Sequence, residues 1–497
     1  MPNKIISVYS NIATLGKTGY AINLAAGITR LADERALLIN MTRQAEGLPE
    51  AIAGIDILNL EELDSQRMEQ IKKEHSHIVI NLPLGMNESL YEILGCSDAI
   101  HYFVDSTRDS LVASYEFLEE LLKKGMQEIH SKIKVVVNRL NIFDKFSKGE
   151  ISWLVRRDIW AIVPEPGILE TPVDAEGVPL VLKTQPSLYS KAILRIIKRE
   201  LDMMVGLALG SGAAFGIAHI GVLKVLEQNR IPVDIVSGSS IGALIASMLG
   251  LGYSSDRIEY FAKKLTNKLK IMRLLDFTLP VSGILAGRRL KRFLKTILGE
   301  KTFEDLEIPV KIMVYDLANR ETLTMESGQL VEAVYMSIAV PGIFEPKTER
   351  ERVMVDGGIS DPVPVDALLK EGVKKIIAVN VLPGPEDIHE RNMLLKKRSK
   401  EDEVQMLTGS FGIRLKLKIR NFFRRIFTPN IFDVIMTSIQ SMEYDLAEAS
   451  CKKASVVLRP VVIDATSIDF HLVRNFIKKG EEETLAHIDQ IKKMVEP

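Results

Sequence analysis

The chain has 497 residues, of which 46% are hydrophobic; this suffices for about two or three domains with full cores and excludes a disordered or fibrous protein. The formal net charge of −1 gives no global attraction to nucleic acid. The two cysteines, Cys96 and Cys451, lie far apart and predict neither a disulfide framework nor a structural metal site, which fits a reducing cytosol.

The amino terminus, MPNKIISVYS, lacks the basic start and the long apolar stretch of a secretory signal, so we expect a cytoplasmic protein. Residues 203–223 are apolar enough to resemble a membrane span, but glycines interrupt them repeatedly. A glycine-rich loop would leave backbone groups unsatisfied in lipid. We therefore predict a strand, a loop and a helix in this stretch instead of a span.

In the first half of the chain, short aliphatic runs alternate with amphipathic helical stretches. The runs that predict buried strands are 4–9, 35–40, 77–81, 99–105 and 132–138. A helical stretch at 187–201 closes this half. Such alternation predicts a parallel sheet covered by helices.

A second alternating series follows, and a helical tail begins at about Asp469. The strands that this series predicts are 204–210, 233–237, 310–316, 352–358, 374–381 and 453–460. The chain is therefore predicted to be an α/β protein with two domains, each a mainly parallel sheet flanked by helices.

The change of series near Met203 predicts a first domain at 1–202 and a second at 203–465, followed by the tail at 466–497. Residues 384–403 are dense in charge and poor in apolar periodicity, which predicts a solvated connector. We interpret residues 384–428 as an insertion in the second domain.

The segment SNIATLGKT, residues 10–18, follows a predicted strand and precedes a predicted helix. In this setting backbone N–H groups and a lysine hold nucleotide phosphates. Gly16, Lys17 and Thr18 match that pattern, whereas Asn11 stands where the pattern has its first glycine. With the strand order, this segment makes residues 1–200 resemble the ParA and MinD family of partitioning and division-site ATPases.

The resemblance implies acidic residues at two strand ends, one for the hydrolytic water and one for Mg²⁺, but this chain has Asn40 and Asn81 there. Amides are poor ligands for a hard cation, so we expect hydrolysis to be lost. Asn138 and Arg139 match positions where the family contacts adenine. An inert scaffold and an ATP-binding switch remain as interpretations, and an active ATPase is the least favoured.

In the second half, the sequence IVSGSSIGALIASM places Ser240 between a predicted strand and a predicted helix. Gly238 and Gly242 flank it in a GxSxG pattern, which exposes a nucleophilic serine on a sharp turn. The same small residues also suit a purely structural turn, so the pattern alone leaves both interpretations open.

Two further segments favour catalysis. The glycine-rich loop LGSGAAFGIAH, with Gly210, Gly212 and Gly216, leads into a helix whose free N–H groups suit an oxyanion. In VMVDGG, Asp356 ends a predicted strand, and Gly357 and Gly358 let another loop approach closely.

These three segments, in this order, resemble the patatin-like phospholipases over about residues 205–465, and SIAVPGIFEP and PNIFDVIMTSI continue the match. The resemblance implies that Ser240 is the nucleophile, that Asp356 is its dyad partner, and that the amides of Gly212 and Ala213 form the oxyanion hole. It also implies catalysis without histidine or metal.

One departure from the family lies in this loop, where Ala213 and Phe215 replace a glycine and a basic residue. Ala213 can donate its N–H, but a positive φ would strain it.

A catalytic triad, the alternative to a dyad, would need a histidine after Asp356. His389, His471 and His487 lie in the connector and the tail without a convincing site, and His219 is expected to pack in its helix. We also expect apolar neighbours to raise the proton affinity of Asp356.

The stretch RLKLKIRNFFRRIF, residues 414–427, carries six basic side chains, no acid and an apolar helical face. A basic amphipathic helix suits an anionic membrane surface, so peripheral membrane contact through residues 411–428 is one interpretation. Packing of the apolar face on the second domain is the other. No base-reading motif accompanies this patch, so no nucleic acid partner is expected.

The sequence thus favours a cytoplasmic serine esterase of the patatin-like class that acts on a phospholipid or lysophospholipid and needs no cofactor for hydrolysis. The first domain is expected to regulate, localise or dimerise it, so a homodimer is an open alternative. The competing hypothesis is a non-catalytic, nucleotide-responsive adaptor or membrane-localising protein in which both enzyme-like folds survive as binding modules.

Overall fold

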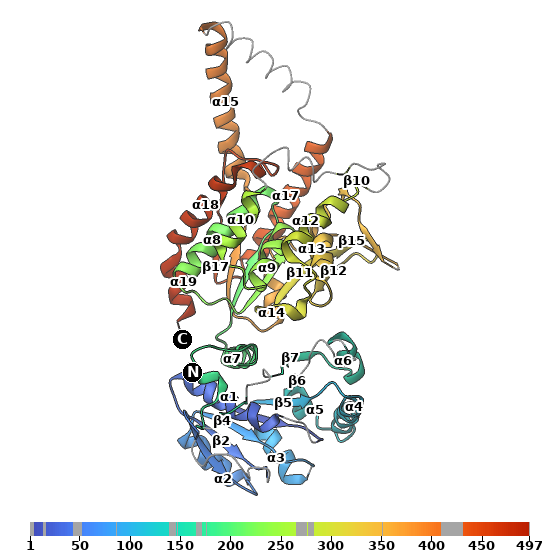
Figure 1. Ribbon diagram of the computed structural model, residues 1–497, viewed down its shortest axis with the longest axis vertical. Coiled ribbons are helices and arrows are strands. Elements are labelled where there is room, and N and C mark those ends of the chain that lie inside the picture. The colour runs from blue at the N-terminus through green and yellow to red at the C-terminus, as the bar shows by residue number, and fades with distance from the viewer. Residues whose placement is uncertain are drawn as a thin grey trace. The chain divides into compact units, whose positions relative to one another are not determined.

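The computed structural model describes residues 4–12, 16–42, 52–85, 87–138, 146, 148–165, 171–174, 176–264, 276, 283–349, 351–408 and 431–496. They form two compact units, an N-terminal unit at Met1–Asp202 and a C-terminal unit at Met203–Glu496. Figure 1 labels the elements of both units.

The N-terminal unit contains a seven-stranded sheet in the order β3-β2-β4-β1-β5-β6-β7. Every strand pair described in it is parallel. The strands are β1 (Lys4–Tyr9), β2 (Ala36–Asn40), β3 (Ile55–Asn59), β4 (His77–Asn81), β5 (Ala99–Val104), β6 (Ile133–Asn138) and β7 (Ile159–Val163). The predicted strands all form, and the two edge strands β3 and β7 add to them.

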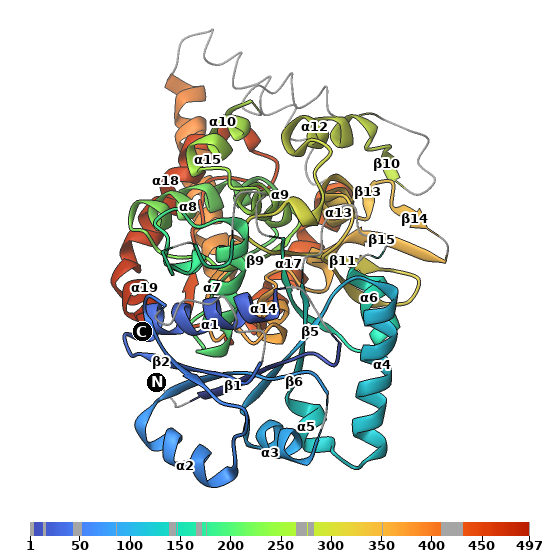
Figure 2. The ribbon, with the colours of Figure 1, turned by 60° about the horizontal axis from the view of Figure 1, so that its bottom comes forward.

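Helices cover both faces of this sheet, because its central strands are apolar on both sides. Helices α1 (Lys17–Ala32) and α7 (Leu188–Glu200) contact each other on one face, while α2 (Ser65–Glu74), α3 (Glu88–Cys96) and α5 (Gln127–Lys132) lie on the other (Figure 2). The remaining described helices of this unit are α4 (Arg108–Lys123), α6 (Lys148–Val155) and the short η2 (Leu180–Leu182).

The C-terminal unit contains a mixed sheet in the order β14-β15-β11-β9-β8-β16-β17, with β12 beside β11. Its strands are β8 (Val205–Leu209), β9 (Ile235–Ser239), β11 (Val310–Asp316), β12 (Glu321–Met325), β14 (Lys347–Glu349), β15 (Arg352–Asp356), β16 (Lys375–Val379) and β17 (Val456–Leu458). The pairs from β11 to β17 are parallel, whereas β12, β14 and β15 pair antiparallel. The α/β prediction is confirmed, with an antiparallel edge added to the second sheet.

Two apolar layers enclose this sheet. One face packs against α8 (Ala218–Gln228), α9 (Ile241–Gly250), α13 (Leu330–Ile338) and α18 (Val473–Ala486). The other packs against α14 (Val365–Lys370) and α17 (Ile431–Cys451). The other described elements of this unit are α10 (Ser255–Lys263), α12 (Arg288–Leu298), α15 (Pro385–Thr408), α19 (Ile488–Val495), β10 (Gly283–Leu285), β13 (Gly342–Phe344), η3 (Ala213–Ile217), η4 (Phe303–Asp305), η5 (Gly357–Ile359) and η6 (Phe470–Leu472).

Residues 384–403, predicted to be a solvated connector, form most of helix α15. The described side chains of this helix between residues 385 and 397 are exposed or half-buried, which fits a sequence without apolar periodicity, and its Glu, Lys, Arg, Leu and Met residues favour helix intrinsically. Pro385 takes the first helical position, where a missing N–H costs nothing, and the Asp387 carboxylate accepts a 2.8 Å hydrogen bond from the Gly384 N–H. The predicted membrane segment, 411–428, lies outside the described residues.

Candidate active site

Ser240 occupies the sharp turn between β9 and α9, at φ 54° and ψ −123°. A non-glycine residue adopts this left-handed conformation only at a cost, and such strain concentrates at functional sites. The Ser240 N–H donates a 3.0 Å hydrogen bond to the Ser337 Oγ of α13, which helps to hold the turn. The serine hydroxyl is therefore presented on a strained but anchored backbone.

The glycines beside Ser240 are required by close packing. A Cβ on Gly242 would lie 2.1 Å from the Leu209 carbonyl oxygen at the end of β8, and a Cβ on Gly238 would lie 2.6 Å from the Gly242 backbone. Neither clash can be relieved by a side-chain movement, because the opposing atoms are backbone. Small residues at both positions thus let α9 begin directly against the sheet.

Asp356 ends β15 and lies beside the serine. The Ser240 Oγ donates a 2.7 Å hydrogen bond to Asp356 Oδ2, and the Gly358 N–H donates a 2.8 Å hydrogen bond to Asp356 Oδ1. The antiparallel pairing of β15 with β11 places this carboxylate next to the end of β9. The structure therefore brings together the two side chains that the sequence proposed as a dyad.

Burial dominates the electrostatics of this carboxyl group. It raises the pKa of Asp356 to about 7, although the hydrogen bonds from Gly358 and Ser240 act to lower it. Burial thus acts in the direction that was predicted from the sequence for the proton affinity of Asp356. A carboxyl group with a pKa near neutrality is a far better base for a serine than an exposed aspartate.

The loop after β8 carries the proposed oxyanion donors. No described residue accepts a hydrogen bond from the N–H of Gly212 or Ala213, whereas the N–H of Ser211 is bound to the Pro362 carbonyl and that of Ala214 to the Ser467 carbonyl. Ala213 has φ 50°, a positive φ that strains a residue with a Cβ. Anchored neighbours thus flank two N–H groups that remain available as donors.

Phe215 and His219 have structural surroundings. The Phe215 ring is 2% exposed and packs edge-on against Phe476 of α18, with ring centroids 6.0 Å apart. Phe215 is an uncharged residue of the core, so it supplies no charge to a substrate. His219 Nε2 donates a 2.8 Å hydrogen bond to the Gly210 carbonyl, and burial lowers the pKa of His219 to about 4. It therefore braces the loop as a neutral side chain.

The three histidines that follow Asp356 lie elsewhere. His389 is exposed on α15, His471 lies 3.6 Å from Asp469, and the His487 ring bonds the Glu483 carbonyl. Among the described residues, none of these rings forms a hydrogen bond with Ser240 or Asp356.

Two contacts in this site were not foreseen from the sequence. Ser337 accepts from the Ser240 N–H, and Ser211 Oγ donates a 3.1 Å hydrogen bond to Glu443 Oε2 on α17. A signal for Glu443 does exist, because it precedes the buried Ala447 and Cys451 by four and eight residues and so lies on the same helical face. A carboxylate in an apolar stripe is unusual enough to be noticed.

The phosphate-loop residues of the N-terminal unit are engaged with protein groups. The Lys17 ammonium donates to the Leu82 carbonyl, and burial lowers the pKa of Lys17 to about 8. Asn11 donates a 2.8 Å hydrogen bond to the Ala113 carbonyl and accepts one of 2.5 Å from Tyr102. Gly16 begins α1 at φ 91°, as a phosphate loop requires.

The two strand-end amides form one buried network. Asn81 Nδ2 lies 3.1 Å from Thr18 Oγ1 and 3.0 Å from Asn40 Oδ1, and Thr42 Oγ1 donates to the same Asn40 oxygen. An N–H donor thus points at the hydroxyl that would bind Mg²⁺ in a phosphate loop, which does not fit a cation. The described residues contain no group of three metal-binding side chains. Asn138 is buried at the end of β6, and Arg139 lies outside the described residues.

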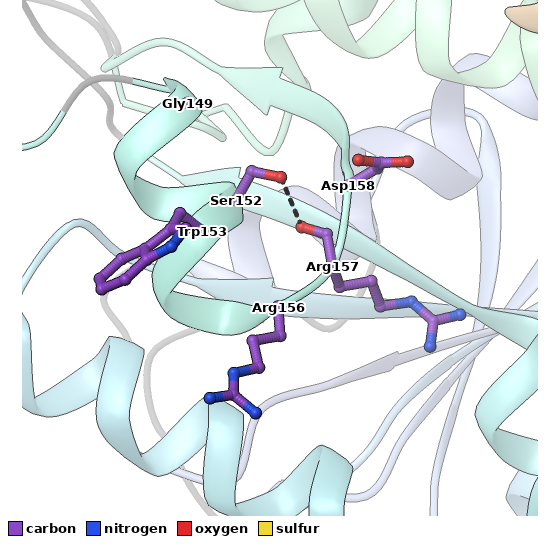
Figure 3. Close-up of a pocket in the computed structure, with 6 residues that line it drawn as sticks. All are labelled: Gly149, Ser152, Trp153, Arg156, Arg157 and Asp158. Atoms are coloured by element: carbon purple, nitrogen blue, oxygen red, sulfur yellow. Dashed lines mark hydrogen bonds between the residues drawn. The ribbon is translucent and has the colours of Figure 1, made fainter.

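A separate surface pocket lies on the N-terminal unit, at the end of α6 (Figure 3). Its lining residues are Gly149, Ser152, Trp153, Arg156, Arg157 and Asp158. Ser152 Oγ donates a 2.9 Å hydrogen bond to the Arg157 carbonyl, and the Arg157 guanidinium donates to the His130 carbonyl at 2.8 Å. These contacts hold the turn after α6 in place.

Known proteins are similar to part of the C-terminal unit. Residues 207–369 match the family model described as patatin-like phospholipase. Lysophospholipase NTE1 of Meyerozyma guilliermondii is 28% identical over 57% of this chain and 19% of its own length. An uncharacterised NTE family protein of Mycobacterium bovis is 35% identical over 36% of this chain and 49% of its own. This chain therefore matches about a fifth of the first relative and about half of the second.

A solved structure is similar to part of this chain. It is the MinC:MinD cell division protein complex of Aquifex aeolicus, with 19% identity, coverage of 40% of this chain and 95% of that chain, and a TM-score of 0.34.

No helix in the described part of the chain has the length and apolar character that a membrane crossing needs. The segment that matches the patatin-like phospholipases, residues 207–369, contains both Ser240 and Asp356, and the resemblance read from the sequence is thereby confirmed.

Proposed function

We propose that this protein hydrolyses the acyl ester of a lysophospholipid or phospholipid, with Ser240 as nucleophile and Asp356 as its base. The observation that carries the proposal is the 2.7 Å hydrogen bond from Ser240 Oγ to Asp356 Oδ2, formed on a strained strand-to-helix turn. The family match and the lysophospholipase relative support the reaction class and the kind of substrate.

In the acylation step, Ser240 Oγ attacks the ester carbonyl carbon and its proton passes to Asp356 Oδ2. The negative charge that develops on the carbonyl oxygen is stabilised by the N–H groups of Gly212 and Ala213. The tetrahedral intermediate then collapses, and the alcohol part of the substrate leaves with the proton held by Asp356. The acyl chain remains as an ester on Ser240.

In the deacylation step, a water molecule attacks the acyl carbonyl while Asp356 takes its proton. The same N–H groups stabilise the second oxyanion. Ser240 regains the proton and the fatty acid is released. One carboxyl group therefore acts as base and acid in turn, which suits a pKa near neutrality.

The test is fatty-acid release from palmitoyl lysophosphatidylcholine and dipalmitoyl phosphatidylcholine by the full chain. Ser240→Ala is expected to abolish the release. Ser239→Ala is a matched control, because the adjacent Ser239 Oγ is buried without a hydrogen-bond partner among the described residues and has no role in the mechanism. Equal release by Ser240→Ala and the wild type would refute the proposal and favour the non-catalytic adaptor.

For the N-terminal unit, we propose a regulatory or localising role without ATP hydrolysis. The hydrogen-bonded amides Asn40 and Asn81 support this, since they offer a donor where a metal needs an anionic oxygen. Calorimetric titration of ATP tests it. Binding is expected to be weak or absent and unaffected by Mg²⁺, and tight Mg²⁺-dependent binding would contradict the proposal.

We further propose peripheral contact with the cytoplasmic face of a membrane through residues 411–428, on the strength of their basic amphipathic sequence. Co-sedimentation with vesicles that contain phosphatidylserine is expected to exceed that with neutral phosphatidylcholine vesicles and to fall at high salt. Equal binding to both kinds of vesicle would argue against an electrostatic contact.

A further inference from the structure

One carboxyl group joins the two loops of the candidate active site. Glu443 Oε2 accepts the 3.1 Å hydrogen bond from Ser211, which directly precedes the oxyanion donor Gly212. Its other oxygen lies against Gly358, because a Cβ there would be 2.9 Å from Glu443 Oε1. The Gly358 N–H in turn binds Asp356. Glu443 therefore contacts both the loop that would hold the oxyanion and the turn that holds the base.

The surroundings of Glu443 favour its protonated form. Burial, and then the negative charge of Asp356, raise the pKa of Glu443 to about 8, while the hydrogen bond from Ser211 acts in the opposite direction. Within the described residues, no lysine or arginine forms an ion pair with Glu443. The carboxyl group is thus held next to another carboxyl group without a compensating cation.

Other charged groups lie near α17. On α14, Asp366 forms an ion pair with Lys453 at 2.7 Å. Beyond η5, burial and then the negative charge of Asp366 raise the pKa of Asp361 to about 6. On α17 itself, Glu448 pairs with Arg459 at 2.8 Å. Asp356 is therefore the described charge that acts on Glu443.

We propose that Glu443 is a positioning residue of the active site and that loss of its proton inhibits ester hydrolysis. This inference rests on the proposed function. With one negative charge on the pair, Asp356 can act as base while neutral Glu443 supports the Ser211 hydroxyl. When both carboxyl groups are ionised, a second negative charge lies against the loop of Gly212 and Ala213 and opposes the oxyanion formed there.

The two carboxyl groups are expected to titrate as a coupled pair, so the pKa values seen in the rate profile belong to the pair and not to either residue alone. The value of kcat/KM rises with pH as Asp356 ionises and falls again as Glu443 ionises, which gives a bell-shaped profile. Gln is neutral at every pH and still accepts from Ser211. We therefore expect Glu443→Gln to abolish the alkaline fall and to leave the acid limb in place.

The experiment measures kcat/KM on palmitoyl lysophosphatidylcholine between about pH 5 and pH 10 for four proteins. The wild type is expected to be bell-shaped and Glu443→Gln to reach a plateau. Ser211→Ala removes a hydrogen bond that lowers the pKa of Glu443, so its alkaline fall should move to higher pH. Glu448→Gln, on the same helix but bound to Asn380 and Arg459, should keep the wild-type profile.

A second measurement does not depend on activity. Because the pKa of Glu443 is raised on folding, the folded protein keeps a proton that the unfolded chain releases, and stability falls as pH rises from about 4.5 to about 8. As pH rises across this range, the Tm of Glu443→Gln should therefore increase relative to the Tm of the wild type. A constant difference in Tm would mean that Glu443 holds no such proton and would overturn the inference.

The outcomes separate the inference from the proposed function. An alkaline fall that persists unchanged in Glu443→Gln, in a wild type that hydrolyses the ester through Ser240, overturns the inference alone. A uniform loss of activity with an unchanged profile gives Glu443 a purely structural role and also overturns it. Absence of Ser240-dependent hydrolysis overturns the proposed function and the inhibition together, while the Tm comparison still reports the buried proton.

Discussion

The two units place polar side chains at the carboxyl ends of strands in opposite chemical states: amides at the ends of the parallel strands β2 and β4, and a carboxyl group at the end of the antiparallel strand β15. In the N-terminal unit, Asn81 Nδ2 donates to Thr18 and to Asn40, while Asn81 Oδ1 is buried without a hydrogen-bond partner among the described residues. In the C-terminal unit, Asp356 keeps its carboxyl group and binds Ser240. An amide does not titrate, whereas a buried carboxyl group has a raised proton affinity that catalysis can use. This contrast supports our proposal that the C-terminal unit is catalytic and that the N-terminal unit is not.

Loss of the carboxylate in the C-terminal unit should have the largest effect. Asp356→Asn retains the shape of the side chain and removes the base, so kcat is expected to fall roughly 10²–10⁴-fold. Steady-state release of fatty acid measures this change. A kcat within a factor of about two of the wild type would show that another group takes the serine proton.

The pH dependence on the acid side should be the next largest effect. Asp356 must be ionised to act as base, and burial raises its pKa to about 7, so activity is lost as pH falls through that value. We expect kcat/KM to decrease about tenfold for each pH unit below about 7. A flat profile down to about pH 5 would place the controlling pKa near that of an exposed aspartate and contradict the role of burial.

The amide network can be broken in the N-terminal unit by Asn81→Asp. A carboxylate cannot donate to Thr18 and Asn40, and the position is fully buried, so the free energy of unfolding should decrease by about 1–3 kcal/mol. Urea denaturation measures this, with Asn392→Asp, at an exposed position on α15, as a control for the same change in charge. An unchanged or increased free energy would show that the site tolerates an anion and that the contrast between the units is weaker than stated.

The smallest expected effect concerns the oxyanion loop. Ala213 has φ 50°, so Ala213→Gly should relieve strain and increase the free energy of unfolding by at most about 1 kcal/mol, with kcat unchanged or slightly higher. Thermal unfolding and fatty-acid release measure the two quantities. A loss of stability would indicate that the Ala213 methyl group contributes packing that exceeds the strain.

The sequence predicted those parts of the site that depend on local patterns. Ser240, Asp356 and their glycines lie within short motifs at strand ends, and the order of aliphatic runs was enough to place them on two α/β units. Ser337 and Glu443 were not predicted, because their contacts with the site join residues about a hundred or more positions apart. Such contacts follow from tertiary packing and leave only indirect signals in the sequence.

The differences in the fold have similar causes. The antiparallel strands β12 and β14 are largely exposed or half-buried and each pairs with a single strand, so their apolar periodicity is weak. The described side chains of α15 between residues 385 and 397 are exposed or half-buried, and this part of the helix shows charge where a packed helix shows an apolar stripe. In both cases intrinsic propensity and hydrogen bonding, more than burial, determine the local structure.

The central claim is that Asp356 activates Ser240, and covalent labelling with a fluorophosphonate tests it directly. Peptide mass spectrometry should find the label on Ser240 in the wild type and in Ser239→Ala, and Asp356→Asn should be labelled slower by about the same factor as its loss in kcat. Labelling of Ser240 at an equal rate in Asp356→Asn and the wild type, or a label on a different residue, would contradict the account.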